Sequence, residues 1–153
     1  MMIQDIEKTI REYIPSTLHM SLATSVDNRP RVCEVHFVYD QDLNFYFRSK
    51  PSRRHSQEIA TNPYVSANIV EQHAREDKPR AVYLEWSAEM IHWDDIKKIV
   101  NLFQKRFDLD ASDIVEESSK ENGHKFYKIS VSNFALFDKR ESNPSQKYEL
   151  KRK

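Results

Sequence analysis

The chain has 153 residues, of which 39% are hydrophobic and 31% charged, as in an ordinary globular domain. A chain of this length can bury a core without disulfides or metal ions. Lys and Arg together number 24, as do Asp and Glu, so no overall charge attracts nucleic acid or an anionic membrane. We therefore expect any bound anion to depend on a local group of basic residues.

Several classes of site and location are excluded by residue counts. The single cysteine, Cys33, excludes an internal disulfide and a thiolate zinc cluster, and it suits a reducing compartment. Gly123 is the only glycine, whereas phosphate loops of the Walker and dinucleotide types need several. The six histidines are scattered without metal-ligand spacing, so no metal site is predicted. The N-terminus does not resemble a signal peptide and no apolar run would span a membrane, which favours a cytoplasmic protein.

The first half of the chain predicts one helix, three strands and a second helix. Apolar residues at helical spacing predict an amphipathic helix over residues 3–14, which Pro15 ends. Extended segments joined by short polar connections then predict antiparallel strands, over residues 18–25, 31–39 and 43–48. Ser52 is the expected N-cap of a helix that runs to residue 61 and ends before Pro63.

The second half predicts three more strands and two helices. The expected strands cover residues 64–70, 81–91 and 126–137, and the expected helices cover residues 94–107 and 110–117. Closing such an antiparallel sheet removes its edges, so we predict a mainly β (α+β) barrel that forms one domain over residues 1–140. Residues 141–153 are polar, and we expect a frayed C-terminal tail there.

The strongest functional signal is the segment Tyr46–His55, which reads YFRSKPSRRH. It places four basic residues around the start of the predicted second helix. A helix N-terminus offers free N–H groups and partial positive charge to an anion, and arginine side chains match the geometry of phosphate. Cations in a first helical turn oppose the helix dipole, and a bound phosphate would remove that conflict. The alternative is a solvent-exposed basic turn.

The order of the motifs resembles the pyridoxamine 5'-phosphate oxidase-like family of FMN-binding split barrels. The matching segments are SLATSVDNRPRV (21–32), VYDQDLNFYFRSKPSRRHSQEIATNPYVSANI (38–69) and, more weakly, PRAVYLEWSAEM (79–90). The resemblance implies a six-stranded antiparallel split β-barrel with flanking helices. It also implies a homodimer with FMN at the interface.

The resemblance assigns cofactor-binding roles to particular residues. Ser52, Arg53 and Arg54 match the phosphate-binding positions, and Phe47, Arg48 and Ser49 match positions that line the flavin. The stretch from Arg31 to His36 matches the strand beside the flavin ring, although a strand histidine also has a purely structural interpretation. Ala81 and Tyr83 match positions that complete the pocket of the other subunit.

The resemblance implies an FMN-binding flavoprotein, and we predict a flavin-dependent oxidoreductase that acts on an unknown small molecule without an assigned catalytic residue. The C-terminal Arg-x-His signature of true vitamin B6 oxidases is absent, so pyridoxine oxidation is not expected. Two alternatives remain open. One is a module that binds or sequesters FMN without turnover. The other is a split barrel that binds haem or a deazaflavin, which the replacement of a family glycine by Trp86 permits.

Overall fold

The computed structural model describes residues 1–141 and 146–152. In this part of the chain the helices are Ile3–Tyr13 (α1), Arg54–Thr61 (α2), Ile96–Phe107 (α3) and Ala111–Ser119 (α4), with short 3-10 turns at Ile14–Ser16 (η1) and Trp93–Asp95 (η2). The strands are His19–Val26 (β1), Arg29–Tyr39 (β2), Phe45–Ser49 (β3), Tyr64–Val70 (β4), Arg80–Met90 (β5), Lys125–Asp138 (β6) and Lys147–Lys151 (β7). None of the helices in these ranges is both long enough and apolar enough to cross a membrane.

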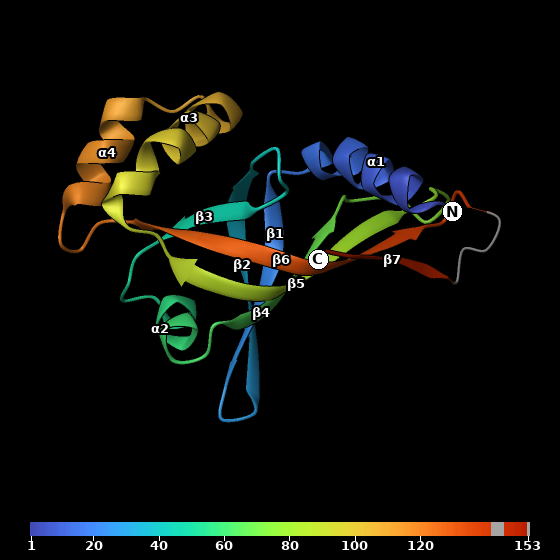
Figure 1. Cartoon of the computed structure of the whole chain (residues 1–153), viewed down its shortest axis with the longest axis horizontal. Coiled ribbons are helices and arrows are strands. Elements are labelled where there is room, and N and C mark those ends of the chain that lie inside the picture. Colours follow the sequence, from blue (N-terminus) through green and yellow to red (C-terminus); the bar gives the residue numbers. More distant parts are fainter. Residues whose placement is uncertain (142–145, 153) are drawn as a thin grey trace.

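The strands form one antiparallel sheet that closes on itself (Figure 1). Their order is β3-β2-β1-β4-β5-β6-β7, and a further pairing between β3 and β6 completes a six-stranded barrel. The first part of β6, residues 125–129, pairs with β3, and a later part, residues 133–137, pairs with β7. The predicted six-stranded antiparallel barrel with flanking helices is therefore confirmed, and β7 extends it.

The strand β7 corrects the expectation of a frayed tail. Its segment KYELK alternates charged residues with Tyr148, which is half-buried, and Leu150, which is buried in the core. This alternation is typical of a half-buried strand, but the high charge of the segment concealed it. Residues 142–145 and 153 of the expected tail lie outside the described residues.

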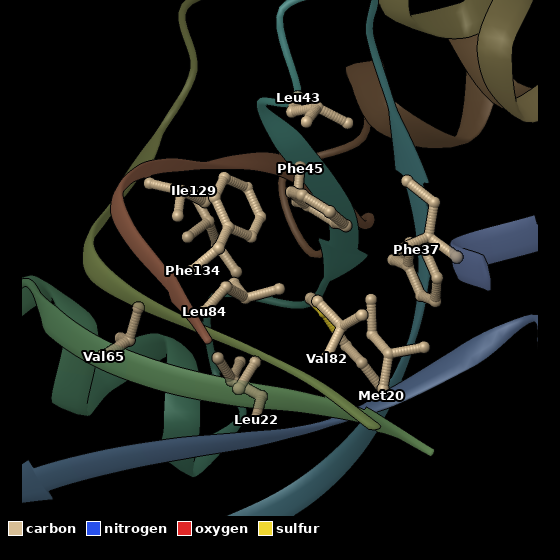
Figure 2. Packing of buried hydrophobic residues seen from close by; sticks show 14 of the residues in the cluster. Met20, Leu22, Phe37, Leu43, Phe45, Val65, Val82, Leu84, Ile129 and Phe134 are labelled. Atoms are coloured by element: carbon tan, nitrogen blue, oxygen red, sulfur yellow. The ribbon is translucent and has the colours of Figure 1, made fainter. Parts of the chain in front are cut away.

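Two hydrophobic clusters hold the elements together. The first fills the barrel, where Phe37, Phe45 and Phe134 point toward one another (Figure 2). The second lies outside the barrel, where α3 and α4 pack on Val38 and Tyr46 of β2 and β3. The ends of β2 and β3 are consequently buried on both faces, which fixes the backbone next to the candidate site.

The N-cap of α2 differs from the prediction by one residue. The helix begins at Arg54 and its N-cap residue is Arg53, which makes no side-chain capping bond. Ser52 lies instead in the preceding turn, in which the Arg53 N–H donates to the carbonyl oxygen of Lys50 over 2.9 Å. Ser52 is therefore not the helix N-cap, because this turn delays the helix.

Candidate functional site

A cleft of about 520 Å³ opens where the middle of β2 and the end of β3 meet the turn before α2 and the C-terminal end of α3. This volume lies within the range of about 300–1,000 Å³ that is typical of small-molecule sites. One wall is basic and another is apolar. The lining residues are Glu34, Val35, His36, Arg48, Ser49, Lys50, Arg53, His55, Phe103, Phe107, Leu109 and His124.

The alternation of β3 decides which of its residues reach the cleft. Phe47 points into the barrel, is fully buried, and stacks on Tyr127 with ring centroids 5.1 Å apart. Its neighbour Arg48 points the opposite way and lines the cleft. Of the three consecutive residues predicted to line a flavin, the structure therefore places Arg48 and Ser49 in the cleft and Phe47 in the core.

Arg48 is incompletely paired. Its Nη2 lies 3.3 Å from Oε2 of Glu117, and its guanidinium lies 5.6 Å from the centre of the Phe126 ring. Its Nε is buried and has no hydrogen-bond partner among the described residues. Burial lowers the pKa of Arg48, although the Glu117 carboxylate opposes this effect. The long contact with Glu117 leaves guanidinium donors of Arg48 that an anion in the cleft would accept from.

His124 is oriented by the same carboxylate. Its Nδ1 lies 2.9 Å from Oε1 of Glu117, and its backbone N–H donates to Oε2 over 2.8 Å. Burial raises the pKa of Glu117, but hydrogen bonds from His124 and the nearby charges outweigh this effect and lower it. An ionised Glu117 accepts a hydrogen from Nδ1, and in the neutral imidazole with that hydrogen the lone pair is on Nε2.

The backbone at Gly123 brings these two residues together. A side-chain carbon at this position would lie 1.8 Å from the carbonyl oxygen of Glu117, closer than any real contact. Because glycine has no such carbon, the chain entering β6 can lie directly against the end of α4. His124 follows immediately and meets the Glu117 side chain.

The basic wall of the cleft contains a cluster of two hydroxyl groups and one imidazole, from Ser49, Ser56 and His55. The Oγ of buried Ser49 lies 2.7 Å from Nε2 of His55, and Ser56 donates to the same oxygen over 3.0 Å. Burial lowers the pKa of His55, and the positive charge of Arg53 lowers it further. The His55 imidazole is therefore neutral at neutral pH.

The apolar wall comes from the end of α3. Phe103 and Phe107 are stacked with ring centroids 6.0 Å apart, and Phe107 meets His36 edge-on at 5.4 Å. This aromatic surface and the basic residues line the same cleft. The cleft therefore suits a ligand that has a flat apolar body and at least one anionic group.

Four of the predicted residues lie together in this cleft, namely His36, Arg48, Ser49 and Arg53. The structure places Ser52, Arg31 and Arg54 outside the cleft. Arg54 pairs with Glu58 over 2.8 Å, Ser52 is exposed in the turn, and Arg31 is exposed on β2. Ala81 and Tyr83, which the resemblance assigns to the pocket of the other subunit, lie on β5. Ala81 is buried, and Tyr83 is half-buried with the Lys147 ammonium 4.2 Å from its ring centre.

Sequence reasoning missed His55, His124 and the aromatic residues of α3 as members of the site. His55 lay inside the basic segment, so that segment could have indicated it. No sequence signal linked His124 to residue 48, because the pairing of β3 with β6 brings them together.

The comparisons with solved structures show the fold. The haem storage protein HutZ from Vibrio cholerae superposes with a TM-score of 0.67 at 19% identity, covering 90% of this chain and 95% of that chain. A haem-binding protein from Mycobacterium smegmatis superposes with a TM-score of 0.74 at 15% identity. The match covers 99% of this chain but only 58% of that protein. A NimC/NimA family protein from Clostridium acetobutylicum gives 0.65 at 14% identity, with coverages of 97% and 94%.

No protein-family model and no curated protein matches the sequence. At these identities the structural similarities establish the architecture alone. The chain is an α+β protein with a split-barrel fold, the fold it shares with these proteins.

Proposed function

We propose that the cleft binds haem and that His124 is the iron ligand. The main observation behind the proposal is that His124 lines the cleft and that its Nδ1 is hydrogen-bonded to the Glu117 carboxylate. Metal-ligating histidines commonly donate their other ring N–H to a carboxylate, which fixes the ring and raises its basicity. No partner of His124 Nε2 occurs among the described residues, so this nitrogen is available to iron.

The other residues that line the cleft suit the carboxylates and the macrocycle of haem. Arg48, Lys50 and Arg53 would bind the haem carboxylates through their positively charged groups. Phe103 and Phe107 would contact the macrocycle and exclude water from it. Across residues 1–141 and 146–152, no three His, Cys, Asp or Glu side chains are arranged to hold a metal ion. A single histidine is sufficient when the macrocycle supplies the other ligands.

When bound, haem would supply an iron centre that can exchange electrons and bind a further ligand. The chain itself would orient His124 through Glu117, hold the proton at Nδ1 and neutralise the haem carboxylates. Two of the three similar structures described above are named as haem-binding or haem storage proteins. Their names support the proposal.

FMN is the second candidate for the same cleft. The specific observation in its favour is the grouping of Lys50 and Arg53 beside the Ser49 hydroxyl, which suits a phosphate dianion. Ser52 and Arg54, two of the three residues expected to bind that phosphate, do not line the cleft, and this weakens the flavin alternative. With FMN bound, the protein would be a flavin-dependent oxidoreductase or a non-catalytic flavin carrier.

We further propose that the chain forms a homodimer through the outer face of β2, β1 and β4. The strand register places Val32 beside Ala23, and Ala23 beside Ser66, on this face. Val32 is 71% exposed and Tyr64, on the same face of β4, is 58% exposed. Large apolar side chains on a sheet face rich in small residues are typical of a self-association surface. Light scattering coupled to size exclusion tests this proposal, and a monomer at all concentrations would contradict it.

The test of the cofactor proposal is an absorbance spectrum of the purified protein, followed by titration with haemin. We expect a Soret band whose position and intensity change in His124→Ala, with weaker haemin binding, because the axial ligand is lost. His73→Ala is the matched control, since His73 is exposed on a loop outside the cleft, and its spectrum should equal that of the wild type. Flavin bands with released FMN would support the second candidate instead. If the protein binds neither haemin nor FMN, both cofactor proposals are wrong.

A further inference from the structure

His55 is a cleft residue to which the proposed function gives no role. It is half-buried, it lines the cleft next to Arg53, and the Ser49 hydroxyl fixes its Nε2 at 2.7 Å. The hydrogen bond from Ser56 fixes Ser49 in turn. The position of the imidazole is therefore set by two buried hydroxyl groups rather than by solvent.

The cluster can satisfy both protonation states of this imidazole. When His55 is neutral, Ser56 donates to Ser49, and Ser49 donates its own hydrogen to Nε2. When His55 is protonated, Nε2–H donates to Ser49 instead. The Ser49 hydrogen then turns to the carbonyl oxygen of Lys50, which lies 3.4 Å from Oγ. In both states Nδ1 carries a hydrogen, for which the described residues contain no acceptor.

The charges around the imidazole determine which state prevails. Burial lowers the pKa of His55, the Arg53 charge lowers it further, and the Glu58 carboxylate on α2 raises it in part. The end of α3 contributes only uncharged side chains to the cleft. The other titratable or charged groups that line the cleft are Glu34 and His36 of β2, Arg48 of β3, Lys50 before the turn, and His124, which directly precedes β6 and contacts Glu117 of α4.

We infer that His55 takes up a proton when the anionic group of a ligand enters the cleft beside Arg53. The protonated imidazole then donates a hydrogen bond from Nδ1 to that group. The inference rests on the proposed function, because it requires an anion in the cleft. The added negative charge offsets the charge of Arg53 and stabilises the imidazolium ion. The proton comes from solvent, and no covalent bond changes.

Proton uptake makes ligand affinity depend on pH. A ligand that binds together with one proton loses affinity by up to about tenfold for each pH unit, over the range between the pKa values of free and bound His55. The cleft would therefore bind anionic ligands more tightly in mildly acidic solution. It would release them as the pH rises.

The experiment follows the His55 ring resonances by NMR across a pH series, with and without gallium(III) protoporphyrin IX. This diamagnetic porphyrin carries two carboxylates, and its dimethyl ester is the matched ligand without them. We expect the titration midpoint of His55 to rise by about one pH unit or more with the free acid and to stay unchanged with the ester. In His55→Gln the affinity for the free acid should lose its pH dependence, whereas His73→Gln should retain it.

Two outcomes separate this inference from the proposed function. If the free acid binds at every pH while the His55 midpoint stays where it is, the inference is wrong and the proposed function stands. If neither porphyrin binds at any pH, the proposed function fails and the inference fails with it.

Discussion

Two arginine–glutamate pairs involve the predicted phosphate-binding segment, Arg54–Glu58 and Arg48–Glu117. They differ in how many of their hydrogen-bonding atoms have partners. Glu58 accepts from Arg54 Nε over 2.8 Å and from the Thr24 hydroxyl over 2.6 Å, so both of its oxygens are used. The contact between Arg48 and Glu117 is longer, at 3.3 Å, and Arg48 keeps a buried Nε without a partner among the described residues. The two pairs come from arginines only six positions apart in the sequence.

The difference separates a structural contact from a binding contact. The Thr24–Glu58–Arg54 group joins β1 to α2 and leaves no buried donor that a ligand would satisfy. The Arg48–Glu117 pair lies in the cleft and retains hydrogen-bonding capacity that an anion would use. Basic residues close together in a sequence therefore need not share one task.

The largest expected effect separates the two arginines by ligand affinity. Arg48→Ala should weaken haemin binding by about 10- to 100-fold, because a charge-assisted hydrogen bond contributes about 1.5–3 kcal/mol. Arg54→Ala is the matched control and should leave the affinity unchanged, since its side chain does not line the cleft. Titrations monitored at the Soret band measure both variants. Equal losses would show that the two pairs do not differ in function.

A second prediction concerns the satisfied pair. Thr24→Val should lower the free energy of unfolding by about 1–2 kcal/mol, because the Thr24 hydroxyl is buried and its loss removes a donor to Glu58. Haemin affinity should not change. Urea denaturation measures the stability, and the same Soret titration measures the affinity. A variant with wild-type stability but weaker haemin binding would reverse the assignment.

The smallest expected effect is a change in acid stability. Hydrogen bonds from Thr24 and Arg54 lower the pKa of Glu58. Its contribution to stability is therefore complete above about pH 4.3, the usual value for glutamate, and is lost as the pH falls through the lowered pKa. Glu58→Gln should be less stable than the wild type at pH 7, and the difference should shrink at pH 3. A difference that stayed constant between these two pH values would contradict the ionised pair.

Much of the barrel could be predicted from the sequence because strand alternation and turn residues are local signals. The helix around residue 54 was also predicted, but its N-cap was placed one residue early. That small shift matters for function, because it decides that Arg53 faces the cleft while Arg54 pairs with Glu58. The opposite directions of Phe47 and Arg48 follow from the same alternation that predicted their strand.

The rest of the site could not be predicted because it depends on contacts between distant segments. His124 lies beside the cleft only because Ser49 pairs with Lys125 as β6 closes the barrel. The pairing of His124 with Glu117 requires in addition the close approach at Gly123. No periodicity in the sequence encodes either of these contacts.

The use of glycine in this chain also bears on how readily the site could be lost. Asp27, Asn28, Leu43 and Asp108 adopt positive φ angles between 52° and 59° without being glycine. The one glycine stands where the end of α4 leaves no room for a side chain. Every single-base change that alters the encoded amino acid at a glycine codon introduces a side chain. The barrel core lies elsewhere, so a single mutation at codon 123 could separate His124 from Glu117 while leaving a folded protein. A substitution at this one position can therefore remove the site while the protein keeps its fold.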